Sequence, residues 1–190
     1  TLVVVDEVCA EWDRPGTPSA VSLLAAYPQL VVTRTMSKAF ALAGGRLGYL
    51  VAAPEVIDAL RLVRMPYHLS SQTQAVARAA LAHRASLLAE VEAIKVQRDR
   101  IVDVLAAQGF PPVPSDANFV LFGGLADASR TWETLLAHGV LVRDVGIPHH
   151  LRVTAGTPEE TTAFLDAMAA LPADHRLPTP VGTWTRGGPR

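Results

Sequence analysis

Residues 31–49 read VVTRTMSKAFALAGGRLGY, and this stretch decides how the rest of the chain is interpreted. The apolar, β-branched run at 31–33 is typical of a buried strand, and polar residues follow it up to Lys38. The long stem of a lysine at such a place can lie in an apolar site while its amine reaches a ligand. Desolvation, or a neighbouring cation such as Arg46, would favour the neutral amine that Schiff-base chemistry needs.

The same stretch carries groups that suit a phosphate dianion. Thr35 and Ser37 offer hydroxyl donors, and Arg46, eight residues after Lys38, offers a bidentate cation. The adjacent glycines 44–45 would let the backbone approach a ligand closely. The alternative is that Lys38 and Arg46 are solvated loop cations, and the joint spacing of these residues disfavours it.

The pattern T-x-S-K-x(7)-R-x-G-Y resembles the pyridoxal-phosphate lysine motif of the class I/II aminotransferases, and RTMSKAF-ALAGGRLGY is most similar to the histidinol-phosphate aminotransferases among them. The resemblance implies that Lys38 binds the cofactor covalently, while Thr35, Ser37 and Arg46 hold its phosphate. It also implies an α/β fold: part of a large domain with a mainly parallel sheet and helices, followed by a small α+β C-terminal domain.

Composition narrows the class of protein. Of 190 residues, 49% are hydrophobic and 18% charged, with a net charge of -1, which predicts a packed core and gives no basic surplus for nucleic acid or an acidic membrane surface. The single cysteine excludes an internal disulfide and a multi-cysteine metal site. No apolar run approaches the roughly 20 residues that span a bilayer, and no signal-peptide pattern opens the sequence. We expect a cytoplasmic protein without a metal.

The first strand is expected at residues 2–5, which are apolar on both faces, as in the interior of a parallel sheet. Such a strand needs neighbours, and the sequence begins at Thr1 with no preceding turn. We therefore expect this chain to be the later part of a longer protein, cut inside a domain.

That strand ends at Asp6, and functional groups collect at the carboxyl ends of strands in α/β sheets. A buried aspartate there needs a cationic partner. The resemblance implies that this partner is the protonated pyridine nitrogen of the cofactor. The alternative is that Asp6 caps the following turn or helix.

One position departs from the family pattern. The family usually has D-E-A-Y-x-E-F, in which the tyrosine hydrogen-bonds the phenolic oxygen of the cofactor, whereas this chain has D-E-V-C-A-E-W. Cys9 therefore stands at the tyrosine position. A thiol is shorter and a weaker donor, so we expect altered tuning of the cofactor.

Periodicity and turn residues predict the remaining elements. The helix that begins after Thr157 should have a capping box with Glu160. Further helices are expected at residues 22–27, 54–64, 70–108 (broken or kinked), 128–138 and 158–171, and strands at 30–33, 47–52, 118–122, 140–143 and 151–154. We expect residues 1–70 to be part of the large cofactor-binding domain, 71–109 connecting helices, 110–171 the small domain, and 172–190 a disordered tail.

Two arginines are candidates for binding substrate. Arg152 lies in LRVTAGTPEE, which matches the family pattern L-R-[IV]-[TS]-x-G-T-x-E-E, and a strand-borne arginine suits bidentate capture of an α-carboxylate. Arg143, in GVLVRD, matches a second family position associated with substrate recognition, although Asp144 could pair with it locally. The pair 149–150 (HH) lacks a third ligand for a metal.

The resemblance implies a transaminase that moves an amino group between L-glutamate and imidazole-acetol phosphate in histidine biosynthesis, working as a homodimer on small amino-acid and keto-acid substrates. Relatives acting on aromatic or other amino acids share most of the pattern. A different class also stays open. The family's ring-stacking aromatic residue, glycine-bearing phosphate loop and asparagine precede the D-E motif and are not in this chain, so a truncated, inactive fragment or an interaction module is the alternative.

Overall fold

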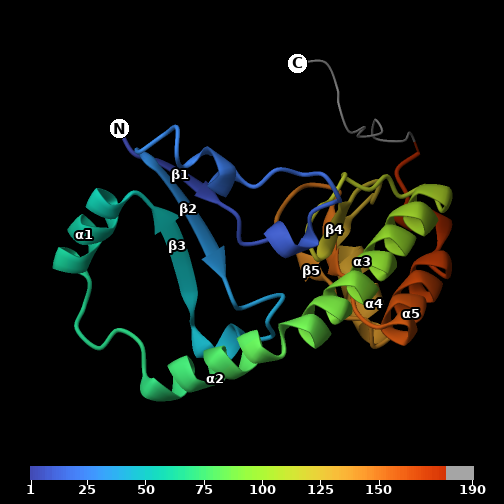
Figure 1. The fold of residues 1–190 in the computed structure, drawn as a ribbon. Helices are drawn as coiled ribbons and strands as arrows, with labels where there is room; N and C mark the ends of the chain where they lie inside the picture. Colours follow the sequence, from blue (N-terminus) through green and yellow to red (C-terminus); the bar gives the residue numbers. More distant parts are fainter. Residues whose placement is uncertain (179–190) are drawn as a thin grey trace. The chain divides into compact units, whose positions relative to one another are not determined.

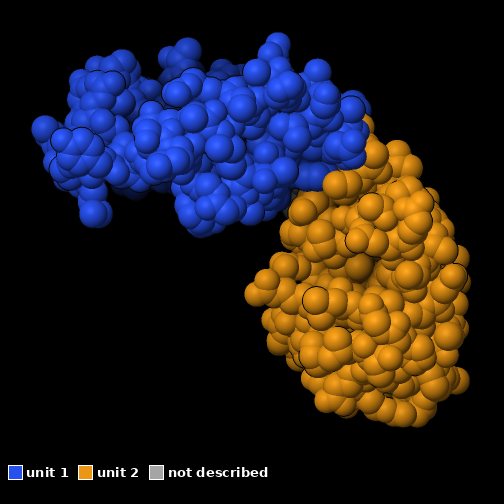
Figure 2. Space-filling model, turned by 90° about the horizontal axis from the view of Figure 1, so that it is seen from below, with its two compact units in different colours: residues 1–91 blue, residues 92–190 orange. Residues whose placement is uncertain are grey.

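The computed structural model describes residues 1–178, and the chain divides into two compact units, residues 1–91 and residues 92 onward (Figures 1 and 2). The division falls inside one long helix, α3 (Arg84–Ala107). The expected disorder of residues 179–190 lies outside the described part of the chain.

The first unit is built on a three-stranded sheet of β1 (Val3–Asp6), β2 (Leu30–Thr35) and β3 (Gly48–Ala52), in the order β1-β2-β3 (Figure 1). β1 runs parallel to β2, with Asp6 opposite Thr33, and β3 runs antiparallel to β2, with Gly48 opposite Thr35. The fold is α/β. Within residues 1–178, however, this sheet has one parallel and one antiparallel pair, so the expectation of a mainly parallel sheet does not describe it.

The middle strand β2 is the buried one: Val31 and Val32 are 5% and 0% exposed. β1 is different, because Val3 and Val4 are 49% and 61% exposed. The expectation that this first strand is buried on both faces is therefore wrong for the described residues. Val3 and Val4 point to opposite faces of the sheet, so neither face is covered at this edge strand.

Short 3-10 helices connect the strands of this unit. The helix expected at 22–27 is instead a 3-10 helix, η2 (Ala20–Leu23), because the Ser19 hydroxyl accepts a hydrogen bond from the Val21 N–H and starts the turn earlier. Two others are η1 (Ala10–Trp12) and η3 (Ala43–Gly45), and the α-helices are α1 (Pro54–Val63) and α2 (Ser71–Ala82). The break expected within 70–108 falls at His83, between α2 and α3.

The second unit contains an antiparallel sheet in the order β4-β6-β5, made of β4 (Phe119–Phe122), β6 (Leu151–Thr154) and β5 (Arg143–Asp144), with α4 (Ala128–Ala137) and α5 (Pro158–Ala169). One sheet face is buried, and there the ring of Phe122 meets that of Phe164 on α5 edge-on at 5.9 Å between centroids. The predicted capping box of Thr157 and Glu160 is present at the start of α5. These strands and helices form an α+β layer around one core.

Two expectations for this unit are corrected. The strand expected at 140–143 is reduced to β5, because the Val142 carbonyl accepts a hydrogen bond from the Trp132 indole and the Val140 N–H bonds to Leu135 at the end of α4. The expected disorder of residues 172–178 is also wrong. A 3-10 helix, η4 (Ala173–His175), follows α5, and the His175 side chain is only 3% exposed.

Candidate active site

Lys38, whose amine is predicted to be reactive, contacts Cys9, the residue that stands at the family's tyrosine position. Lys38 Nζ is 2.9 Å from Cys9 Sγ, and both side chains are half-buried. The loop that carries Lys38 is fixed by Met36 and Ala39, which are 4% and 6% exposed. The Met36 N–H also bonds to the Leu47 carbonyl, which closes the loop between β2 and β3. The structure thus brings together the D-E motif (residues 6–12) and the S-K motif (residues 35–38), which are far apart in sequence.

The two predicted phosphate hydroxyls are neighbours. Thr35 Oγ1 lies 2.9 Å from Ser37 Oγ and also accepts a hydrogen bond from the Ser37 N–H. Thr35 pairs with Gly48 across β2 and β3, and Gly48 lies two residues after Arg46. The strand register therefore brings the backbone of Thr35, Ser37 and Arg46, the predicted phosphate ligands, to one end of this strand pair. The Arg46 side chain is exposed and donates to the Ala43 carbonyl at 3.3 Å.

The loop between Lys38 and β3 contains two non-glycine residues with a positive φ. Arg46 has a φ of 48° and Ala41 a φ of 52°, which is unusual for residues with a side chain and costs about 1–3 kcal/mol each. Gly45 lies close to Leu42, because an added Cβ would lie 2.7 Å from the Leu42 side chain, which would have to move. Strained residues held by their surroundings are frequent at ligand sites, although they do not identify the ligand.

Asp6 occupies the carboxyl end of β1, as the sequence predicted, but its environment differs from the expected one. The side chain is exposed, and Oδ1 accepts a hydrogen bond of 2.8 Å from the Thr33 hydroxyl on β2. A carboxylate at a solvated strand end needs no buried cation. The expectation of a buried Asp6 is therefore wrong for the described residues, because the edge position of β1 leaves this end open.

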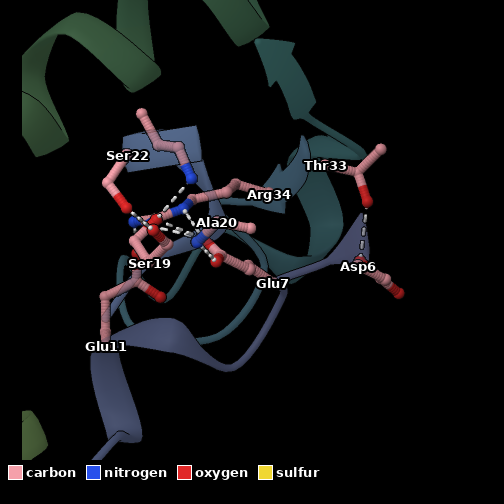
Figure 3. A network of polar contacts seen from close by, with 9 residues as sticks. Asp6, Glu7, Glu11, Ser19, Ala20, Ser22, Thr33 and Arg34 are labelled. Atoms are coloured by element: carbon pink, nitrogen blue, oxygen red, sulfur yellow. Dashed lines mark hydrogen bonds and ion pairs between the residues drawn. The ribbon is translucent and has the colours of Figure 1, made fainter. Parts of the chain in front are cut away.

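Beside Asp6 lies a polar network that the sequence analysis missed (Figure 3). The Glu7 carboxylate accepts hydrogen bonds from the Ala20 N–H at 2.6 Å, the Ser19 hydroxyl at 2.8 Å and Arg34 Nη2 at 2.7 Å. Arg34 Nε reaches the same Glu7 oxygen at 3.2 Å, and Arg34 Nη2 also donates to Ser19 at 3.0 Å. The sequence does contain a hint of this network, because its two charged residues adjoin predicted site residues: Glu7 directly follows Asp6, and Arg34 directly precedes Thr35.

The electrostatics of this network follow from its contacts. Burial by itself raises the pKa of Glu7, but the hydrogen bonds from Ala20, Ser19 and Arg34 outweigh it, so the pKa of Glu7 is lowered. Burial likewise opposes ionisation of Arg34, yet its hydrogen bond and charge interaction with Glu7 leave the pKa of Arg34 raised. The side chains of Arg34 and Glu7 are 22% and 13% exposed, so this ion pair is largely shielded from water. Both groups are held in their charged forms.

The two arginines predicted to bind substrate lie side by side in the second unit. Arg143 on β5 is the direct cross-strand partner of Arg152 on β6. The Arg152 guanidinium stacks over the Phe119 ring at 4.7 Å from its centroid, and Arg152 Nε is buried with no hydrogen-bond partner among the described residues. Asp144 instead accepts hydrogen bonds from Ser129 and Gly146. Two like charges directly opposite each other on a sheet are unfavourable unless an anion lies near them.

Other groups in the described residues carry less chemistry. His149 Nδ1 lies 2.8 Å from the Leu125 carbonyl, and residues 1–178 contain no cluster of three or more His, Cys, Asp or Glu side chains suited to a metal ion. No helix within that range is both long and apolar enough to cross a membrane.

Comparison with known sequences defines the class of protein. The family described as aminotransferase class I and II matches residues 1–168, which include every candidate residue named above. The chain belongs to this family.

Particular relatives narrow the similarity. The chain is 62% identical over 178 residues to the histidinol-phosphate aminotransferase of Paenarthrobacter aurescens, covering 92% of this chain and 48% of that protein. It is 64% identical over 167 residues to that of Frankia casuarinae, covering 88% and 42%. It also resembles the structure of histidinol-phosphate aminotransferase from Sinorhizobium meliloti in complex with pyridoxal-5'-phosphate, with 30% identity, a TM-score of 0.77, and coverage of 89% and 48%. The chain spans about half the length of these relatives.

Proposed function

We propose that the protein containing this chain is a pyridoxal-phosphate-dependent aminotransferase that moves an amino group between L-glutamate and imidazole-acetol phosphate, in histidine biosynthesis. The observation that carries the proposal is the contact between Lys38 Nζ and Cys9 Sγ, because it joins the S-K motif to the D-E motif in one site. The relatives above 60% identity, which are named histidinol-phosphate aminotransferase, support the choice of substrate.

The residues present fit the cofactor. The site offers a primary amine, two adjacent hydroxyls and a guanidinium, which are the groups that an aldehyde and a phosphate dianion require. When bound, pyridoxal phosphate supplies an electron sink that stabilises negative charge at the substrate Cα. Lys38 would hold the cofactor, and Thr35, Ser37 and Arg46 would bind its phosphate.

Two side chains would handle protons. The Asp6 carboxylate, oriented by the Thr33 hydroxyl, would hold a proton on the pyridine nitrogen. The Lys38 amine, once free, would move a proton from the substrate Cα as a general base. The Cys9 thiol would lie beside that amine, in the place where the family usually has a tyrosine hydroxyl.

Arg152 would bind the α-carboxylate of the amino-acid substrate, and Arg143 would add a second positive charge on the same sheet. Support comes from the unpaired Arg152 Nε and from the direct pairing of the two arginines across β5 and β6. Phe119 limits the rotation of the Arg152 guanidinium by stacking on it, which presents its fork in a fixed direction.

We also propose that the whole protein is a cytoplasmic homodimer, as the resemblance implies. Two other functions compete with the proposed one: transamination of aromatic or other amino acids, and an inactive fragment that serves only as an interaction module. The first shares all of the cofactor residues and differs in substrate preference. The second would lack turnover even if it bound the cofactor.

Lys38 and Lys95 are the two lysines in the sequence, which makes a trapping experiment decisive. Borohydride reduction of the cofactor-loaded protein should leave a pyridoxyl group on Lys38, identified by peptide mass spectrometry. Lys38→Ala should abolish the adduct and the visible absorption band, whereas Lys95→Ala should keep both. An adduct that persists in Lys38→Ala would end the proposal.

Substrate preference is tested on the same preparation. The value of kcat/KM for imidazole-acetol phosphate should exceed that for an aromatic keto acid such as phenylpyruvate. The reverse order would favour the aromatic alternative. Cofactor trapping without any turnover would favour the inactive fragment.

A further inference from the structure

The strongest unassigned feature near the candidate site is the network around Arg34, which joins four segments of the first unit (Figure 3). Arg34, on β2, bonds to Glu7 at the end of β1 and to Ser19 at the start of η2. Its Nη1 atom also lies 3.8 Å from a carboxylate oxygen of Glu11, on η1. One guanidinium therefore contacts the residues on both sides of Cys9 in sequence.

This arrangement holds both ends of the turn that carries Cys9, whose Sγ contacts Lys38 Nζ. Cys9 lies two residues after Glu7 and two before Glu11, so both ends of its turn are held to Arg34. Lys38 lies four residues after Arg34 on the same segment. The strand register adds to this, because the Glu7 N–H donates to the Thr33 carbonyl at 2.9 Å. A shift of Glu7 against Arg34 would therefore move Cys9 and Asp6 relative to Lys38.

We propose that Glu7 and Arg34 are positioning residues, whose ion pair fixes the turn bearing Cys9 and the strand end bearing Asp6 against the amine of Lys38. This inference rests on the proposed function. The pair does not touch the reacting atoms. It acts through geometry, and a misplacement of about 1 Å at a catalytic group can cost on the order of a hundredfold in rate.

The fork geometry of Arg34 provides the discriminating variant. Lysine keeps the positive charge but cannot bond Glu7 through two nitrogens while also reaching Ser19. Glu7→Gln keeps the size of the side chain and removes its charge. Both changes break the same contact, so their effects should not add.

The experiment compares Glu7→Gln, Arg34→Lys and the double variant in the cofactor-loaded protein. Each single variant should lower kcat by about tenfold to a hundredfold, with KM changed by less than about threefold. The pH midpoint of the cofactor absorption band should also shift in each. The double variant should be no slower than the slower single variant. Asp58→Asn, which breaks the exposed ion pair with Arg61, is the matched control and should leave all of these values unchanged.

Ser19→Ala keeps the test informative if the charge variants fold poorly. It removes one hydroxyl, which bonds Glu7 and Arg34 and also accepts the Val21 N–H at the start of η2, and kcat should fall by about twofold to fivefold. Variants with a lower melting temperature but unchanged kcat and midpoint would overturn the inference, as would additive losses in the double variant. These outcomes are separate from failure of the proposed function, because a wild-type protein without a trapped cofactor refutes that function before any variant is compared.

Discussion

Lys38 Nζ and Cys9 Sγ are in hydrogen-bond contact at 2.9 Å, so the amine of Lys38 meets a thiol at the position where the family pattern D-E-A-Y has its tyrosine. The Lys38 amine donates to the Cys9 sulfur, and sulfur is both a weak acceptor and, as a thiol, a weak donor, so the site lacks a strong hydrogen bond at this point. The consequence is measurable in the spectrum of the bound cofactor.

Cys9→Tyr should lower the pH midpoint at which the cofactor absorption band changes. The phenol would stabilise the ionised oxygen of the cofactor, whereas the thiol does so weakly. The measurement is a spectral pH titration of wild type and variant side by side. Cys9→Ser serves as the control for loss of sulfur without a gain in reach. Superimposable titrations of wild type and Cys9→Tyr would show that position 9 does not touch the cofactor.

Asp6→Asn should reduce kcat by about a hundredfold or more while the borohydride adduct on Lys38 persists, because the neutral amide cannot hold a proton on the pyridine nitrogen. Thr33→Val removes only the hydroxyl that orients Asp6 and should cost about tenfold. Steady-state kcat values with L-glutamate and the keto-acid acceptor give both numbers. Equal losses in the two variants would indicate that orientation, not charge, is the role of Asp6.

Sequence reasoning succeeded where local chemistry decides the outcome. The capping box of Thr157 and Glu160 depends on two residues three positions apart, and the structure contains it. That the helical stretch 70–108 is broken followed from its length, whereas the position of the break at His83 did not.

Sequence reasoning failed where distant residues decide. Glu7 and Arg34 are 27 positions apart, and neither periodicity nor composition pairs them. The strand β5 is short because the Trp132 indole, on α4, donates a hydrogen bond to the Val142 carbonyl. The ordered structure of the segment after α5 depends on a buried contact between His175 and Thr131, which lie 44 residues apart in sequence. Each case is a tertiary contact that overrides the local pattern.

The ion pair of Glu7 should make stability depend on acid pH. Because the folded protein holds the pKa of Glu7 below its ordinary value, the ionised carboxylate contributes stability above that ordinary value. The contribution is lost as pH falls through the lowered folded pKa. Urea unfolding should show Glu7→Gln less stable than wild type by about 1–3 kcal/mol at pH 7, with the difference shrinking below about pH 4. A difference that does not change with pH would contradict this.

The segment after α5 should depend on one buried hydroxyl. Thr131 Oγ1 donates its single hydrogen to the Asp127 carbonyl at 2.7 Å, so the His175 Nδ1 atom, 2.9 Å away, must be the donor to Thr131. Thr131→Val would leave that buried N–H unpaired and should lower the free energy of unfolding by about 1–3 kcal/mol. Thr134→Val, which removes a hydroxyl bonded only to its own helix at Arg130, should cost clearly less. Equal losses in urea unfolding would show that His175 does not use this bond.

The edge of the first sheet should control the solubility of residues 1–190 expressed alone. Val4 is 61% exposed on β1, a strand with one partner in the described chain, and a flat apolar edge is a template for pairing with other molecules. Val4→Lys places a charge on that edge and should raise the soluble fraction and reduce light scattering at equal protein concentration. Val96→Lys is the matched control, because Val96 is 63% exposed but lies on helix α3. An equal gain from both variants would mean that added charge, not the blocked strand edge, limits aggregation.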